Sequence, residues 1–406
     1  MTTMADNKEN RIPNVPHLRF PEFCGEWVET TLGKISEITK GSGISKDQLS
    51  EQGSPCILYG ELYTKYKSEI INEVYSRTEL EPSSLVKSMA NDVIIPCSGE
   101  TAIDISTARC VPFDNILLGG DLNIIRLRND DGGFFAYQLN STRKKDIARV
   151  AQGVSVVHLY GENLKQIRVY HPNTEEQKKI TRLLSLIDER IATQNKIIEK
   201  LESLIKGLVD ELMSVLLKGK LYPFSSFYIK AGEGGTPTTS IVEYYTEGTI
   251  PFIKIEDLSC KYLTNNKDFI TELGMQKSSA WLIPSKSVIY SNGATIGAIS
   301  INEYPVCTKQ GILGIVPNTN INVEYLYLLM SSSYFSKEIS RIITEGTMKT
   351  AYLKDINHIK CPLPSKAQQK NITNLTSSIE EKLSIELKYL FSLNRQKKYL
   401  LRQMFI

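Results

Sequence analysis

The sequence predicts an α+β protein with two globular mixed α/β domains, each followed by a long helix. The two helices are expected to pair as an antiparallel coiled coil with pseudo-twofold symmetry. Three observations predict this architecture: a repeat at an offset of 192 residues, two long segments with apolar residues spaced three and four apart, and short β-like runs before each segment. A shared helical register beside divergent globular parts indicates one scaffold that carries two different binding domains.

The repeat is clearest in two leucine-rich segments. Eleven positions keep their type or apolar character at the constant offset, from Ile167 and Ile359 to Leu212 and Met404. Upstream the offset drifts between 193 and 196, so the globular parts have diverged more than the helices. The predicted parts are a disordered lead-in over 1–14, a first globular domain over 15–173, a first long helix over 174–219, a second globular domain over 220–364 and a second long helix over 365–406.

Composition favours a soluble cytoplasmic protein. Of 406 residues, 41% are apolar, and no apolar run reaches the roughly 18 residues that a membrane-spanning helix needs. The first twelve residues lack the apolar core of a signal peptide, and we expect no membrane association. Seven cysteines, an odd number without a Cys-x-x-Cys pair, fit buried thiols in a reducing compartment. A net charge of +3 permits contact with nucleic acid without demanding it.

Each globular domain shows the same order of elements, strands first and helix last. Gly, Ser, Asn and Asp separate the runs, as turns between strands require. In the first domain, β-like runs are expected at 55–59, 92–97, 116–118 and 122–127, with a helix over 134–151. In the second, they are expected at 250–255, 287–290, 296–301 and 313–316, with a helix over 323–343.

The long helices are predicted over 175–218 and 366–404, each after a proline-bearing entry. Thr174 and Ser365 are the expected N-caps, with Gln177 in the capping-box position of the first helix. At 1.5 Å per residue each rod is roughly 60 Å long. Sustained three- and four-residue spacing with charged flanks favours a coiled-coil seam over two ordinary amphipathic core helices.

The sequence lacks the usual signs of catalysis. It has no phosphate-binding Gly-x-x-x-x-Gly-Lys-Ser/Thr loop, no Gly-x-Gly-x-x-Gly motif after a strand and no Asn-Pro-Pro-aromatic motif for a target base. Its four histidines show no metal-ligand or triad spacing. The pair Glu256 and Asp257 fits a metal nuclease less well than a surface or base-contact role, because neighbours on a strand point to opposite faces. We therefore expect no catalytic residues and no metal site.

Several strings resemble the specificity (S) subunit of type I restriction–modification systems. They are Val-Pro-His-Leu-Arg-Phe at 15–20, Gly-Glu-Leu-Tyr at 60–63, Gly-Gly-Thr-Pro at 234–237, Thr-Lys-Gln-Gly at 308–311 and the paired Pro–Gln–Ile entries to the helices. The resemblance covers the chain from residue 15. It implies two target-recognition domains that each dock one half of a bipartite asymmetric DNA site, and helices that set the spacer.

The same resemblance implies the partners. These are double-stranded DNA, two methyltransferase subunits docked on the helices and two restriction subunits in the full complex. No cofactor is expected on this chain; S-adenosylmethionine, ATP and magnesium are expected in the partner subunits. Two alternatives remain open: a non-catalytic coiled-coil scaffold whose globular domains bind protein, and an enzyme fused to its own specificity domain, which the missing motifs disfavour.

Candidate DNA contacts are polar residues in glycine-marked loops at the ends of the β-like runs. Base edges specify sequence, while phosphate contacts position the protein. In the first domain the expected base readers are Lys40, Ser42, Lys46, Tyr59, Glu61, Tyr63, Ser98 and Glu100. In the second they are Thr236, Lys254, Glu256, Asp257, Asn292, Thr295, Lys309 and Gln310. Phosphate contacts are expected from Arg143, Lys144, Lys145, Lys349 and the backbone near Gly153 and Gly346.

Overall fold

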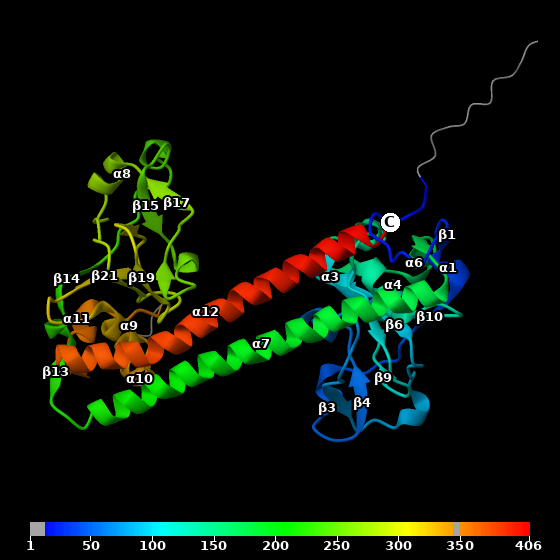
Figure 1. Cartoon of the computed structure of the whole chain (residues 1–406), viewed down its shortest axis with the longest axis horizontal. Coiled ribbons are helices and arrows are strands. Elements are labelled where there is room, and N and C mark those ends of the chain that lie inside the picture. The colour runs from blue at the N-terminus through cyan, green and yellow to red at the C-terminus, as the bar shows by residue number, and fades with distance from the viewer. Residues whose placement is uncertain (1–12, 344–348) are drawn as a thin grey trace, which may run out of the picture. The chain divides into compact units, whose positions relative to one another are not determined.

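The computed structural model describes residues 13–343 and 349–406 and contains two compact units (Figure 1). Unit 1 comprises Met1–Asn195 and Lys388–Ile406, and unit 2 comprises Lys196–Leu387. The long helices α7 (Thr174–Leu216) and α12 (Lys366–Gln403) each contribute one part to each unit. The predicted lead-in falls almost wholly outside the described residues, and Gly346 falls outside them too.

Two four-stranded sheets form the globular part of unit 1. The antiparallel sheet has the order β2 (Ser36–Lys40), β10 (Leu122–Leu127), β6 (Asp92–Pro96) and β8 (Arg109–Val111). The second sheet has the order β3 (Leu49–Ser50), β5 (Ser76–Thr78), β4 (Ser54–Ile57) and β9 (Leu117–Leu118), with β4 and β9 parallel. Two short pairs join β1 (Val28–Thr31) to β12 (Arg168–His171) and β7 (Ser98–Gly99) to β11 (Val157–His158).

Unit 2 repeats this strand order. Its main sheet has the order β14 (Tyr228–Glu233), β21 (Ile312–Pro317), β18 (Val288–Ser291), β19 (Ile299–Asn302) and β16 (Tyr262–Leu263). The smaller sheet joins β17 (Asp268–Ile270), β15 (Ile250–Ile253) and β20 (Cys307–Thr308), and β15 runs parallel to β20 as β4 does to β9. A short pair joins β13 (Leu221–Pro223) to β22 (Lys360–Pro362). The repeat seen in the sequence therefore extends to the topology.

The helix predicted after each set of strands is broken into two, so the prediction of one continuous helix is wrong. The observed helices are α4 (Gly132–Asn140) and α5 (Lys144–Val150) in unit 1, and α9 (Val323–Ser331) and α10 (Ser333–Ile342) in unit 2. In unit 1, the Asn140 side chain bonds both backbone groups of Ala108, at 2.8 and 2.9 Å. In unit 2, Ser332 has extended backbone and its hydroxyl accepts a bond from the Phe335 N–H, so it caps α10. The shorter helices are α1 (Leu32–Ile35), α2 (Glu61–Thr64), α3 (Ala102–Ile105), α6 (Gly161–Lys165), α8 (Glu272–Gln276) and α11 (Leu353–Ile356).

The starts of the two long helices differ in their caps. Ser365 is confirmed as an N-cap, because its hydroxyl accepts a bond from the Gln368 N–H and Gln368 Oε1 accepts one from the Ser365 N–H. Thr174 was the wrong choice for the first helix. The preceding residue, Asn173, accepts the bond from the Glu176 N–H at 2.9 Å, and Thr174 already lies inside α7.

In each unit the globular domain packs on parts of both long helices (Figure 1). The largest core of unit 1 includes Trp27 and Phe134 together with Ile180 of α7 and Phe405, which follows α12. The largest core of unit 2 joins its globular part to residues of both helices, among them Val209, Met213 and Ile372. The mixed α/β fold with two long helices is thus confirmed, whereas the antiparallel coiled coil and its pseudo-twofold axis stay predictions. No helix in the described ranges is long and apolar enough to cross a membrane.

Candidate nucleic-acid interface

Four loops of unit 1 meet where β2 and β6 end and β10 begins. We call residues 40–46, 97–100, 118–121 and 152–158 loop cluster 1. Backbone hydrogen bonds tie them together, including Gly41 N–H to Leu122 O at 3.0 Å and Cys97 N–H to Asp121 O at 2.6 Å. A Cβ at Gly41 would lie 2.0 Å from the carbonyl oxygen of Gly119. Only glycine permits this approach, so the glycine-marked loops are structural as well as exposed.

The matching loops of unit 2 meet in the same way. We call residues 233–236, 291–297, 309–311 and 349–351 loop cluster 2. The Asn292 N–H donates to Gly311 O at 3.0 Å, and the Ala351 N–H donates to Asn292 O at 2.9 Å. The Gln310 N–H donates to Thr236 Oγ1 at 3.3 Å. Two residues predicted as base readers from distant parts of the sequence therefore touch.

In unit 1, five predicted base readers lie in or beside loop cluster 1 with accessible side chains. Lys40 and Lys46 are exposed and have no ion pair in the described part of the chain. Tyr59, Tyr63 and Glu100 lie close together. Partial burial raises the pKa of Tyr63, and the neighbouring Tyr59 and Glu100 raise it further. This group offers two free ammonium groups, two phenols and one carboxylate.

Loop cluster 2 presents a different set. Thr295, Lys309, Gln310 and Lys349 are exposed, and Thr236 is half-buried among them. Amide and hydroxyl groups can read base edges, whereas the ammonium groups of Lys309 and Lys349, which form no ion pair with a residue of the described ranges, suit phosphates. Because the two clusters carry different side chains on the same loops, they can read different sequences.

Three predicted base readers point into the protein, and we remove them from the proposed contacts. Glu61 is buried and accepts bonds from the Leu58 N–H at 3.0 Å and from Lys65 Nζ at 2.6 Å. Asn292 is buried, and its amide nitrogen donates to the Ala351 carbonyl at 3.1 Å. Ser98 is buried within the β7–β11 pair. None of the three side chains is exposed to solvent.

Other side chains predicted to contact DNA already form hydrogen bonds or ion pairs within the protein, which leaves them less available to bind DNA. Ser42 Oγ accepts from the Val86 N–H at 2.8 Å. Lys254 Nζ lies 2.9 Å from Asp268, whose hydrogen bond raises the pKa of that lysine. Asp257 Oδ2 accepts from the Lys254 N–H at 2.9 Å, while Glu256 is exposed.

The predicted phosphate contacts at the start of α5 also differ in whether their side chains are available to bind DNA. Arg143 donates to the Ile406 carbonyl at 2.7 Å and lies over the Tyr170 ring, so it holds the fold of unit 1. Burial lowers the pKa of Lys144, with a further contribution from Arg109. Lys145 is exposed. Of these three cations, only Lys145 is free to meet a phosphate without rearrangement.

Sequence reasoning missed a pair of buried glutamines. Gln177 was assigned to a capping box, yet its Oε1 accepts from the Asp131 N–H at 2.8 Å and its Nε2 donates to Asp130 Oδ1 and Pro172 O at 2.7 and 2.9 Å. Gln369 does the same in unit 2, with Asn322 N–H at 2.7 Å and the carbonyls of Asn320 and Pro364 at 3.1 and 2.9 Å. The signal was present, because the two glutamines are 192 residues apart.

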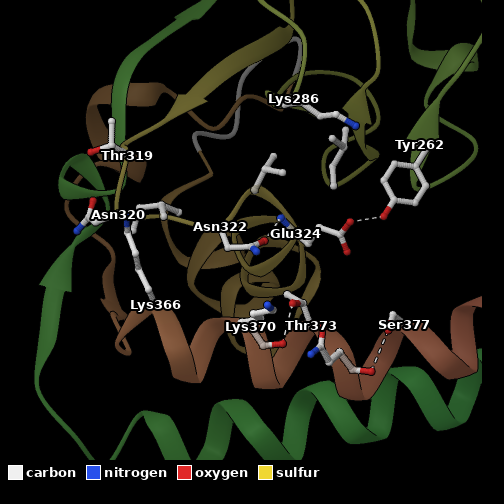
Figure 2. Close-up of a pocket in the computed structure, with 14 residues that line it drawn as sticks. Tyr262, Lys286, Thr319, Asn320, Asn322, Glu324, Lys366, Lys370, Thr373 and Ser377 are labelled. Carbon is white, nitrogen blue, oxygen red and sulfur yellow. Dashed lines mark hydrogen bonds between the residues drawn. The ribbon is translucent and has the colours of Figure 1, made fainter.

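Figure 2 shows a groove of about 660 Å³ in unit 2 that contains none of the predicted DNA contacts. The first turns of α12 form one wall, including Lys366 and Lys370, and the loop before α9 forms another. Tyr262 and Glu324 are hydrogen-bonded on the far side. Because the groove lies along a long helix and not in loop cluster 2, it is separate from the candidate DNA-binding surface.

Comparison with known proteins defines the class. Residues 25–203 and 227–391 match the family described as "Type I restriction modification DNA specificity domain", so both repeats are covered. The chain belongs to this family.

Particular relatives agree with this assignment. The chain is 31% identical to the type I restriction enzyme MjaIX specificity subunit of Methanocaldococcus jannaschii over 36% of this chain and 35% of that protein. The match to the MjaVIII specificity subunit of the same organism has 22% identity and covers 96% of this chain and 94% of the relative. The first of these matches thus spans about a third of the relative's length.

Solved structures share the fold. The S subunit of a type I restriction–modification system from M. genitalium superposes with a TM-score of 0.60 at 19% identity, over 97% of this chain and 99% of that one. A chain from a study of the assembly of a type I restriction–modification system gives a TM-score of 0.55 at 15% identity, over 92% of this chain and 96% of that one. At these identities the likeness shows the fold alone.

Proposed function

We propose that this chain is the DNA-specificity subunit of a type I restriction–modification complex, in which each globular domain reads one half of a bipartite asymmetric target. The observation that carries the proposal is the duplicated sheet, whose two loop clusters carry different polar side chains. One fold used twice with different polar side chains suits two half-sites of different sequence. Exposed lysines in both clusters supply the sequence-independent contribution to DNA affinity.

We assign recognition to this chain and chemistry to its partners. The relatives are named specificity subunits of restriction enzymes, which supports a non-catalytic role in a larger enzyme. On this proposal S-adenosylmethionine, ATP and magnesium bind the methyltransferase and restriction subunits, and the complex acts in the cytoplasm. The purified chain should transfer no methyl group, hydrolyse no ATP and cut no DNA.

The long helices offer the docking surface for methyltransferase subunits. Besides the side chains that they bury, the helices expose large apolar side chains, which in a soluble protein mark contact surfaces. These are Leu186, Ile197, Leu204 and Val215 on α7, and Leu375, Ile385, Leu387, Tyr389, Phe391 and Tyr399 on α12. Because both helices carry such residues, we propose two docking sites and hence two methyltransferase subunits.

The decisive experiment is an exchange of one domain. The chain is co-expressed with its methyltransferase subunit, and methylated sites in the host genome are mapped by sequencing. Replacing residues 27–170 with the same domain of a relative should change one half of the methylated motif and leave the other half intact. Inserting one heptad between Ile191 and Leu201 should lengthen the spacer while both halves persist.

Two outcomes would count against the proposal. A domain exchange that changes both halves of the motif would show that the domains do not read independently. Weak binding to duplex DNA, even with methyltransferase subunits present, would favour the alternative of a scaffold whose globular domains bind protein.

A further inference from the structure

A buried ion cluster joins α12 to the rest of unit 1. Lys397 Nζ lies 2.6 Å from Asp188 of α7 and 2.6 Å from Glu69 of the globular domain. The Tyr137 hydroxyl donates to Asp188 at 2.7 Å, and the Ser68 hydroxyl at 3.1 Å. Burial alone would lower the pKa of Lys397, but the two carboxylates raise it above its ordinary value. The lysine is therefore charged at neutral pH and neutralises two acids that are themselves nearly buried.

The lysine belongs to a segment that docks on unit 1 mainly through apolar contacts. Met404 and Phe405 are buried, and the Phe405 ring lies 5.2 Å from that of Phe134 and 6.4 Å from that of Trp27. Residues 388–406 thus complete the core of unit 1. Apolar contacts of this kind accept many amphipathic helices, so they do not by themselves select this one.

The repeat supplies a second helix with a matching apolar face. Residues 196–214 of α7 are the counterpart of residues 388–406, and they pack in the core of unit 2 through Val209 and Met213. At the position that corresponds to Lys397 this segment has Ile205, which packs against the same core. The two segments therefore differ at the one site where unit 1 requires a cation.

Unit 2 obtains its cation from the globular domain instead. Lys261 occupies the place of Glu69, because the backbone carbonyl of each accepts a hydrogen bond from a corresponding strand of the main sheet. The Lys261 carbonyl accepts from the Ile301 N–H at 2.7 Å, and the Glu69 carbonyl accepts from the Cys110 N–H at 2.8 Å. Lys261 Nζ contacts Glu380 at 2.5 Å and Glu324 at 3.0 Å.

Glu380 is the counterpart of Asp188 at the offset of 192. The two units thus keep an acid at the same helix position and place the balancing lysine on opposite sides of the helix–domain interface.

We propose that unit 1 carries an interaction surface that selects its helix by charge, and that its occupant is residues 388–406 of this chain. A helix with an aliphatic residue at the Lys397 position would remove the lysine that contacts both Asp188 and Glu69, which is strongly destabilising. The buried Arg109 lies near enough to attract both acids, but its guanidinium donates to backbone carbonyls and does not take the place of the lysine. Conversely, a helix with a lysine there would bring a second ammonium group toward Lys261 in unit 2. Each domain therefore accepts one of the two similar helix segments and rejects the other. The inference concerns how the chain assembles and does not depend on which DNA is read.

The first test uses full-length chains with a grafted helix. Residues 388–406 are replaced by the sequence of residues 196–214, which has the same length, in one form with Lys397 retained and in another without it. We expect the form without Lys397 to melt roughly 6–20 °C below the form that keeps it. Equal melting temperatures for the two grafts would overturn the proposal, because apolar packing alone would then decide which helix docks.

The second test separates charge selection from simple packing. Lys397→Ile in the native sequence should lower the melting temperature by a similar amount, whereas Lys398→Ile at the exposed neighbouring position should change it by no more than about 2 °C. Adding Glu69→Gln to Lys397→Ile should recover part of the loss, since one carboxylate then no longer lacks its lysine, while Asp188 is kept because it balances the buried Arg109. A double variant no more stable than Lys397→Ile would refute the selection by charge, and the double variant remains informative if the single variant fails to fold.

Discussion

Replacing Gln177 with alanine should loosen the junction between the first sheet domain and α7. The side chain is fully buried. Its amide makes three short hydrogen bonds, at 2.7, 2.8 and 2.9 Å, and a longer contact with His171 Nδ1 at 3.5 Å. Two of the groups that it satisfies belong to the backbone, the Asp131 N–H and the Pro172 carbonyl. Removing the amide leaves these groups inside the protein without a partner, which costs more than the loss of an exposed bond.

The expected magnitude follows from these bonds. Each lost hydrogen bond costs about 1 kcal/mol, and a buried group left without a partner costs about 1–3 kcal/mol. Gln177→Ala should therefore reduce the free energy of unfolding by about 2–4 kcal/mol. For a unit of this size that corresponds to a fall in melting temperature of roughly 4–16 °C. Gln369→Ala should behave alike in unit 2, because its amide also makes three bonds. Gln368→Ala, which removes only the exposed bonds from the Ser365 N–H and hydroxyl, should cost less than about 1 kcal/mol.

Amide hydrogen exchange gives the local measurement. The Asp131 N–H donates directly to Gln177, so Gln177→Ala should speed its exchange by roughly 30- to 1000-fold. The Asn322 N–H, which donates to Gln369, should keep its protection in the same variant and serves as an internal control. Unchanged protection at Asp131, or a thermal effect no larger than that of Gln368→Ala, would refute the reasoning.

Three further predictions follow from surfaces and charges described above. Phe391→Glu, at a side chain that is 70% exposed, should weaken binding of a methyltransferase subunit in a pull-down or calorimetric titration while leaving the melting temperature within about 2 °C. Gln310→Ala should cost about 1–3 kcal/mol of DNA affinity and relax one position of the methylated motif, whereas Lys349→Ala should weaken all sequences alike and reduce the salt slope by about one. Burial alone would raise the pKa of Asp130, but hydrogen bonds from His171 and Gln177 hold it below its ordinary value. Its contribution to stability is therefore present above the unfolded-state pKa and lost as pH falls through the folded one. Asp130→Asn should destabilise the protein at pH 7, and progressively less as the pH falls below the unfolded-state pKa of about 3.9 in acid-unfolding curves.

The sequence was sufficient where the determining signal was local or periodic. Leu122–Leu127 was predicted with the bounds of β10, because a six-residue run with four Leu and Ile residues is closed by Gly and Asp before it and by polar residues after it. The long helices were predicted to within two residues at each end, since heptad spacing and prolines mark them. The break between α4 and α5 was not predicted, because Asn140 finds its partner, Ala108, 32 positions earlier in the chain.

The candidate DNA-binding loops were likewise predictable in part. Glycine-marked loops at strand ends could be found in the sequence, and the structure brings them together in each unit. Which side chains within them face solvent could not be found, because the deciding partners are distant. Glu61 turns inward toward Ser76, and Asn292 toward Ala351. The acid cluster around Lys397 could not be predicted from the sequence for the same reason, since Glu69 and Lys397 are separated by 328 positions.

The division of the chain into units also sets an order of events during synthesis. Unit 2 is made of one continuous stretch, Lys196–Leu387, so every residue that it needs is synthesised before residue 388 is added. Unit 1 begins first but lacks Phe405 and the cation for its two buried acids until Lys388–Ile406 has emerged. Translation proceeds at about 5–20 residues per second, so the ribosome needs roughly ten seconds or more to traverse the intervening residues. During that interval the earliest domain exposes an apolar surface and two acids, and it is the later domain whose residues have all been synthesised first.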